Sequence, residues 1–206
     1  ELLSIVDVVT TGNHIWAHKD IIPYIAQNPR LIRPMNFPTG VPGRGWTVAE
    51  TSAGIPVVVV NLAGRVFMNA ADCPFRAMEQ ALGQFSSQAT TIIVDFHAEA
   101  TSEKQAMGWF LDGRVSAVIG THTHIPTADE KILHHGTAFI SDVGMTGPWD
   151  SVIGMKKEAA IRRFLTQMPS RFEAARKEVK INAVVVSLDE KTGKATDIQR
   201  ITMETG

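Results

Sequence analysis

The sequence predicts an α/β fold in which helices and mixed β-sheets form layers. Segments with strand and helix periodicity alternate through the first half of the chain, whereas hairpins and paired strands dominate the second half. The runs "VVVV" and "TTIIV" are apolar without interruption, which is typical of strands covered on both faces. We therefore expect a layered arrangement within a single domain that spans residues 1–206.

β-Branched and apolar runs predict the strands, and amphipathic spacing predicts the helices. Residues 4–10, "SIVDVVT", indicate a buried strand, and further strands are expected over 46–51, 55–62, 90–96, 115–120, 181–190 and 194–203, with a hairpin over 131–142. Helices are expected over 18–27, 75–85, 103–111 and 156–168, and Thr101 or Ser102 can cap the third of them. Residues 34–45 and 64–74 are predicted loops.

Composition narrows the class of protein. The chain is 44% hydrophobic and 20% charged, as expected of a globular protein. Its net charge of -1 indicates no basic field for a nucleic acid polymer or an acidic membrane, and no apolar run approaches the roughly 18 residues of a membrane span. The single Cys73 excludes an internal disulfide and fits a reducing compartment, so we expect a cytoplasmic protein.

Polar side chains collect directly after the predicted strands. The five clusters are Asn13 with His14, Asn61 with Arg65, His97 with Glu99, His122 with His124, and Asp142. Because ligands of α/β sheets bind outside the carboxyl ends of the strands, we expect these clusters to converge on one site.

Each cluster also has a structural interpretation. A single histidine after a strand is more often a surface or hydrogen-bonded residue, Asn13 can be a turn residue beside Gly12, and Asp142 can cap a loop. His134 and His135 are expected in a hairpin turn and His18 in a first helical turn, so none of these three is predicted to bind a metal.

Taken together, the clusters favour a metal site. Neutral imidazole is the commonest metal ligand in proteins, and a His-x-His pair in extended backbone places both rings on one side. Imidazoles at His97, His122 and His124 with the Asn13 amide oxygen form a set suited to Zn, Fe or Mn. A metallo-β-lactamase motif is excluded because Pro126 and Thr127 stand where it needs Asp and His.

Six motifs occur in order along the chain: "GNHIW", "RPMNFP", "NLAGRVFM", "DFHAEATSEK", "GTHTHIPTAD" and "SDVGMTGP". With these motifs the chain resembles the YmdB-type phosphodiesterases of the calcineurin-like metallophosphoesterase superfamily. The resemblance implies an α/β/β/α sandwich with a dinuclear metal centre, in which iron or manganese is expected and zinc is an alternative. It also implies hydrolysis of small phosphodiesters such as 2′,3′- or 3′,5′-cyclic nucleotides by a hydroxide held between two metals.

The resemblance also implies roles for individual residues. Asn13, His97 and His122 correspond to ligands of one metal, His124 to a ligand of the other, and His14 to the proton donor for the leaving oxygen. Arg65 can contact the phosphate, although a structural role in its loop is equally compatible with the sequence.

Two family motifs do not occur in the chain. The family has a Gly-Asp-x-x-Gly motif and a Glu-Asn pair that supply metal-binding carboxylates, and Asp7 does not replace them. We therefore expect an N-terminally incomplete domain that binds two, one or no metal ions. The alternative function is a catalytically inactive metal-binding or interaction module. Exposed sheet edges would favour a homo-oligomer.

Overall fold

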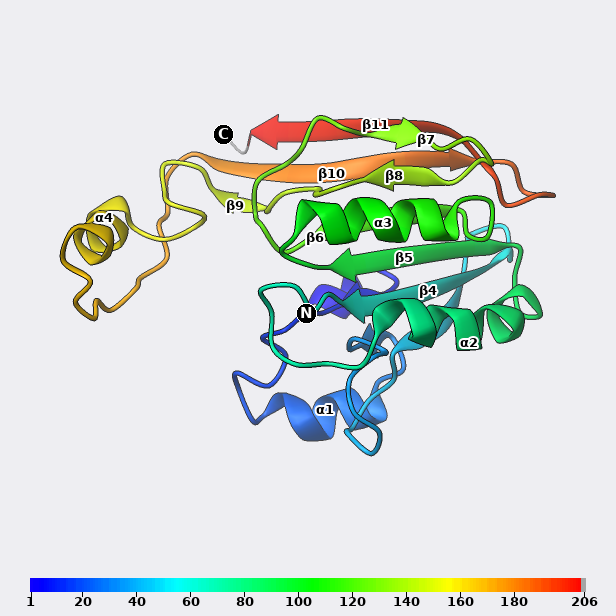
Figure 1. Ribbon diagram of the computed structural model, residues 1–206, viewed down its shortest axis with the longest axis horizontal. Coiled ribbons are helices and arrows are strands. Elements are labelled where there is room, and N and C mark those ends of the chain that lie inside the picture. Colours follow the sequence, from blue (N-terminus) through cyan, green and yellow to red (C-terminus); the bar gives the residue numbers. More distant parts are fainter. Residues whose placement is uncertain (205–206) are drawn as a thin grey trace.

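The computed structural model describes residues 1–204 and contains two larger β-sheets that pack against each other, with helices on the outer face of the larger one (Figure 1). The strands are β1 (Val9–Thr10), β2 (Leu31–Ile32), β3 (Trp46–Glu50), β4 (Pro56–Ala63), β5 (Thr91–His97), β6 (Ala117–Thr121), β7 (Lys131–Ile132), β8 (Ala138–Ile140), β9 (Gly147–Pro148), β10 (Val179–Leu188) and β11 (Ala195–Glu204). The helices are the 3-10 turn η1 (Leu2–Ser4), α1 (Ile21–Gln27), α2 (Pro74–Ser86), α3 (Thr101–Leu111) and α4 (Lys157–Thr166).

The larger sheet has six strands in the order β3-β4-β5-β6-β8-β7. Its central strands β4, β5, β6 and β8 run parallel, whereas β3 and β7 pair antiparallel at the two edges. The smaller sheet has the order β11-β10-β9 and is antiparallel. The predicted fold class, a layered α/β arrangement with mixed sheets, is therefore confirmed.

Strand β5 shows why the apolar runs predict covered strands. Ile92 and Val94 point into the core shared with α2 and α3, whereas Ile93 packs on the opposite side against β10 and β11. The same alternation places Val58 of β4 in the core beneath the helices. Val57, on the other face of β4, is only half-buried. Both faces are thus covered at the centre of the sheet and less completely toward β3.

The prediction of a buried strand over residues 4–10 is wrong. Only Val9–Thr10 is a strand, paired in parallel with β2, and Ile5 is 78% exposed. The Arg30 guanidinium donates hydrogen bonds to the carbonyl groups of Leu3, Val6 and Asp7, and it holds this segment in a curled conformation. A contact with a residue more than 20 positions away therefore overrides the local strand preference.

The predicted helices and the hairpin are confirmed with small shifts of their ends. Met78, Leu82 and Phe85 of α2 are buried, as their spacing predicts, and β7 pairs with β8 as a hairpin. The predicted cap of α3 is wrong, because Ala100 occupies the N-cap position and Thr101 is the first helical residue. None of the helices within residues 1–204 is long and apolar enough to cross a membrane.

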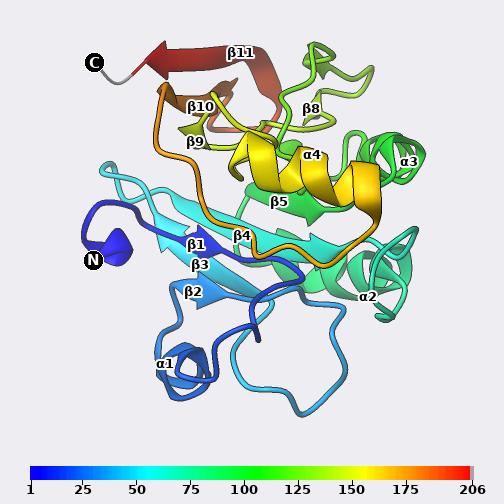
Figure 2. The same cartoon turned by 90° about the vertical axis from the view of Figure 1, so that its left-hand side faces the viewer.

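Helix α4 lies at one end of the molecule, between β9 and β10 in the chain, and it stands away from both sheets (Figure 1). Viewed from that end, α4 crosses in front of the six-stranded sheet (Figure 2). The segment that contains it runs from residue 149 to residue 178 before the chain enters β10.

Candidate metal centre

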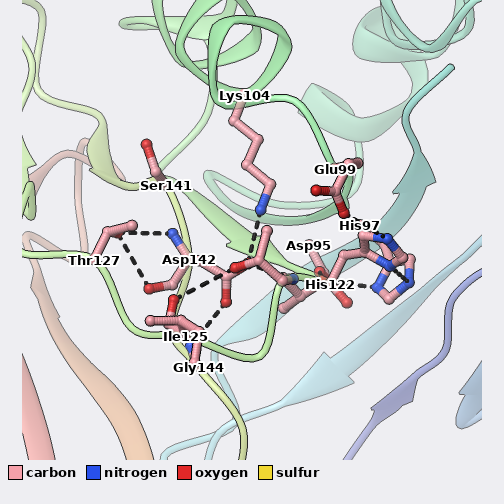
Figure 3. Close-up of polar contacts among 12 residues, drawn as sticks. Asp95, His97, Glu99, Lys104, His122, Ile125, Thr127, Ser141, Asp142 and Gly144 are labelled. Atoms are coloured by element: carbon pink, nitrogen blue, oxygen red, sulfur yellow. Dashed lines mark hydrogen bonds and ion pairs between the residues drawn. The ribbon is translucent and has the colours of Figure 1, made fainter. Parts of the chain in front are cut away.

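The carboxyl ends of the parallel strands bring the predicted clusters together. His97 ends β5 and Thr121 ends β6, and the two residues are register partners in adjacent strands. His122 therefore follows β6 at the same edge of the sheet at which His97 emerges, and the Asn13 loop meets them there. The predicted convergence is correct for these three side chains. It is also correct for Asp142, which follows β8 and accepts a hydrogen bond from the N–H of Thr123, the residue next to His122; Figure 3 shows Asp142 together with His97 and His122.

Two potential ligand atoms lie close to His97 Nε2, which is itself a potential ligand. His97 Nε2 lies 3.0 Å from Asn13 Oδ1 and 3.0 Å from His122 Nδ1. The two imidazole rings meet edge to face, with centroids 4.7 Å apart. Atoms that each bind one metal ion at about 2.0–2.2 Å lie roughly 3 Å from one another. The separations of 3.0 Å therefore fit a shared cation.

Hydrogen bonds on the far side of each ring assign the tautomers. The Thr121 hydroxyl donates to Asp95 Oδ1 at 2.7 Å, so it must accept from His97 Nδ1 at 3.1 Å. His122 Nε2 similarly faces Glu99 Oε2 at 3.1 Å. His97 Nε2 therefore presents a lone pair both to the Asn13 oxygen and to the lone pair of His122 Nδ1. A cation bound by these acceptors would relieve their repulsion.

Burial supports the neutral form of both rings. Burial and the neighbouring His122 lower the pKa of His97 from 6.5 to about 4, and burial also lowers the pKa of His122. Burial raises the pKa of Asp95 to about 6, against the hydrogen bonds from Thr10 and Thr121 that lower it. At neutral pH the site thus contains neutral imidazoles, the form that binds metals, behind an ionised carboxylate.

Steric crowding explains why the "GNH" motif has a glycine at position 12. A Cβ atom on Gly12 would lie 2.4 Å from His97 Nε2, so any larger residue would displace the ring or the Asn13 loop. Gly120 is equally constrained, since its Cβ would lie 1.7 Å from the Ser141 carbonyl oxygen of the adjacent strand end. Both glycines let backbone approach the site closely.

His124 lies outside the three-atom group. Its Nδ1 donates a hydrogen bond to the Ile153 carbonyl at 2.9 Å, which leaves Nε2 as a lone-pair donor, and the residue is exposed. Within residues 1–204, no three His, Cys, Asp or Glu side chains form a metal-binding group, because the converging set has only two imidazoles and an amide. The role of His124 as a ligand of a second metal stays a prediction.

His14 and Arg65 are both exposed at the edge of the site. His14 lies close enough to His97 for its charge to lower the pKa of His97, and it lines a cavity with Ile153. The Arg65 backbone N–H donates to both carboxylate oxygens of Glu103 at 3.1 Å, so the loop is anchored while the guanidinium faces solvent. The roles of His14 as proton donor and Arg65 as phosphate contact stay predictions.

A buried ion pair supports the loop between the two histidines. Asp142 Oδ2 accepts from Lys104 Nζ at 2.7 Å, from the Thr123 N–H at 2.9 Å and from the Thr123 hydroxyl at 2.8 Å. His122 and His124, on either side of Thr123, have φ values of 105° and 70°. Such strain in non-glycine residues persists only where neighbours enforce it, and Asp142 supplies that constraint.

Sequence reasoning missed Lys104, Thr121 and Asp95, and it placed Asp142 among the converging clusters without identifying its buried partner. A signal for Lys104 was available, because it shares a helical face with the buried Met107 and Leu111 of α3. A charged residue within an apolar stripe is expected to have a buried partner. Nothing in the spacing of the sequence identifies that partner as Asp142.

The layered mixed sheets are those of the metallophosphoesterase sandwich class. Residues 1–201 match the family described as YmdB-like protein. The chain is 48% identical over 195 residues to a 2′,3′-cyclic-nucleotide 2′-phosphodiesterase of Bacillus subtilis, covering 95% of this chain and 74% of the relative. It is 34% identical over 203 residues to a putative phosphatase/phosphodiesterase of Mycoplasma pneumoniae, covering 95% and 71%. The chain therefore belongs to the YmdB-like protein family.

Solved structures agree with this assignment. A hypothetical protein from Thermus thermophilus superposes with a TM-score of 0.92 at 40% identity, covering 100% of this chain and 79% of that one. A novel phosphatase from Mycoplasma pneumoniae superposes with a TM-score of 0.89 at 34% identity, covering 97% and 72%. The family resemblance of the motifs and the prediction of an enzyme of the phosphoesterase family are confirmed.

Proposed function

We propose that the chain hydrolyses small phosphodiesters, with 2′,3′- or 3′,5′-cyclic nucleotides as substrates, in a metal-dependent reaction. The observation that carries this proposal is the convergence of Asn13 Oδ1, His97 Nε2 and His122 Nδ1, with two separations of 3.0 Å. The relative named as a 2′,3′-cyclic-nucleotide 2′-phosphodiesterase supports the substrate class.

The donor set fits a metal ion. Two neutral imidazoles and an amide oxygen suit Fe, Mn or Zn, and the orientation of both rings by Asp95, through Thr121, and by Glu99 is the usual arrangement behind metal ligands. Bound metal ions supply Lewis acidity to the phosphoryl group and to the attacking water. His124, whose Nε2 is free to bind, is the residue of this chain proposed to hold a second ion.

The chain's own side chains provide positioning and proton transfer. His14 is exposed beside His97, so it can reach a substrate and take up a proton from solvent before donating it to the leaving oxygen. Arg65, whose backbone is held by Glu103, extends a free guanidinium that can pair with a phosphate oxygen. Both roles depend on exposure at the mouth of the site.

The test is turnover of 2′,3′-cAMP and bis-p-nitrophenyl phosphate with added Mn²⁺ or Fe²⁺. We expect metal-dependent hydrolysis that is abolished by His97→Ala. The matched control is His134→Ala, which removes an imidazole that stacks on Trp109. Hydrolysis that persists in a chelator, or that is unaffected by His97→Ala, would contradict the proposal.

A second candidate is a catalytically inactive module that binds metal or a partner. It is favoured by the absence of carboxylates from the converging donor group within residues 1–204. Metal analysis separates the two candidates: two bound ions per chain with turnover support the enzyme, whereas a bound ion without turnover supports the module. A cytoplasmic location and a homo-oligomeric state stay predictions.

A further inference from the structure

We propose that residues 156–177, which include α4, form a binding arm for single-stranded oligoribonucleotides and deliver their phosphodiester to the metal centre. This inference rests on the proposed function, because it names a longer substrate for the same site. The net charge of the whole chain led to the expectation that no nucleic acid polymer binds. That net charge is an average and does not show that the positive charges are concentrated in one segment.

The arm is strongly basic. Residues 156–177 contain seven Lys and Arg side chains and two Glu, a net charge of +5 in a chain whose net charge is -1. Lys156 pairs with Glu173 and Lys157 with Asp150. The remaining cations are exposed and make no ion pair with a carboxylate among residues 1–204; they are Arg162, Arg163, Arg171, Arg176 and Lys177. A concentration of unpaired cations on one segment attracts a polyanion.

The arm also exposes aromatic rings. Phe164 is 82% exposed and Phe172 is 41% exposed, which is unusual for residues with so much apolar surface. The Arg163 guanidinium lies 5.1 Å from the centroid of the Phe172 ring, so a flat apolar surface and a cation are combined. Basic residues interleaved with aromatic rings are the arrangement that binds single-stranded nucleic acid, since rings stack on bases while cations contact phosphates.

The arm and the metal centre share a cavity. His14, Ile153, Phe164 and Phe172 line a cavity of about 970 Å³, of the size that accommodates a nucleotide. Ile153 in its wall accepts the hydrogen bond from His124 Nδ1, so the cavity is contiguous with a predicted metal ligand. A strand bound along the arm would therefore place its terminal cyclic phosphodiester beside His14, with the preceding nucleotides on α4.

The charge of α4 disfavours a second copy as the occupant. Between Lys156 and Arg163 the helix and its start carry four cations and one anion, so an α4–α4 contact across a two-fold axis would oppose like charges. A polyanion with apolar bases satisfies both the charge and the exposed rings.

The experiment is fluorescence anisotropy with a 5′-labelled octaribonucleotide of mixed sequence that ends in a 2′,3′-cyclic phosphate. Measured in a chelator over a range of salt, binding is expected to weaken as salt rises. Arg162→Gln with Arg163→Gln should reduce the slope of log K against log salt by about 1.4, since each cation that contacts a single strand contributes about 0.7.

Two matched controls separate the arm from general effects. Lys191→Gln with Lys194→Gln removes two exposed cations from the β10–β11 turn at the opposite end of the molecule and should leave the slope unchanged (Figure 1). Phe164→Ala should weaken binding at least about fivefold through lost stacking, whereas Leu165→Ala, which is 79% exposed on the same helix, should not.

Equal effects of the two cation pairs, or no binding at low salt, would overturn the inference. So would arm variants that dissociate a homo-oligomer while leaving oligonucleotide affinity intact, because the arm would then be an interface between copies. Binding is measured without turnover, so an absence of cyclic-nucleotide hydrolysis counts against the proposed function and not against the arm.

Discussion

The buried Lys104–Asp142 ion pair predicts that Asp142→Asn both destabilises the protein and weakens metal binding. Each side chain of the pair is 2% exposed, and Lys104 Nζ lies 2.7 Å from Asp142 Oδ2. Removing one partner of such a buried pair costs about 3–5 kcal/mol, because the remaining charge is left in a poorly solvated position. An exposed pair would contribute only about 0–1 kcal/mol, so the size of the loss reports the burial.

The effect on metal binding follows from the loop that Asp142 holds. Asp142 accepts hydrogen bonds from both the N–H and the hydroxyl of Thr123. Thr123 lies between His122 and His124, which both have positive φ values. Each such residue stores about 1–3 kcal/mol of strain, which is released if the constraint weakens. His122 Nδ1 would then leave its position 3.0 Å from His97 Nε2, and we expect metal affinity to fall about 10–100-fold.

The assay combines urea unfolding in a chelator with a Zn²⁺ titration of each variant. Lys104→Met with Asp142→Asn removes both charges, so it should regain most of the lost stability and none of the lost affinity. Asp112→Asn is the control, because its carboxylate is 5% exposed but its partner His135 is 74% exposed. Asp112 follows α3 and His135 lies in the turn between β7 and β8, so neither residue belongs to the donor group.

Two outcomes would refute this reasoning. A loss of less than about 1 kcal/mol in Asp142→Asn would mean that the pair behaves as an exposed one. A double variant that regains metal affinity together with stability would mean that Asp142 acts only on the fold and does not position the loop.

Three further predictions concern the donor group itself. Thr121→Val removes the bond that orients His97, so Zn²⁺ affinity should fall about tenfold or more in a titration, with little change in far-UV circular dichroism. Gly12→Ala should abolish Zn²⁺ binding, because its Cβ would lie 2.4 Å from His97 Nε2; retained affinity would show that the Asn13 loop can move aside. The third prediction concerns pH. The pKa of Asp95, raised from 3.8 to about 6, makes the folded state bind its proton more tightly, so Asp95 lowers stability as pH rises through that window. The pKa of His97, lowered from 6.5 to about 4, makes stability fall as pH falls through its own window. Asp95→Asn removes the first contribution. As pH falls from 6 to about 4, the free energy of unfolding of this variant, measured in a chelator, should therefore decline relative to that of the wild type. A difference between the two proteins that does not change with pH would contradict the assignment.

The central strands and the convergence of the site were predictable because both depend on local patterns. Uninterrupted apolar runs identify β4 and β5, and the rule that parallel strand ends share one edge places His97 beside His122. The segment 4–10 has the same apolar character, but its conformation is set by Arg30, and no spacing rule predicts that contact.

Prediction also failed for residues that act through a partner. Thr121 and Asp95 look like ordinary strand residues, and only their positions in adjacent strands show that they orient His97. The "THTH" motif predicts two metal ligands. It does not show that Thr123, which lies between them, donates a hydrogen bond to Asp142.

The most informative measurement is anomalous diffraction from crystals of the chain grown with Mn²⁺ or Zn²⁺. We predict a metal peak at bonding distance, about 2.0–2.2 Å, from three atoms: Asn13 Oδ1, His97 Nε2 and His122 Nδ1. A peak bound through His97 Nδ1, a peak elsewhere on the molecule, or no peak at saturating metal would contradict the proposed centre.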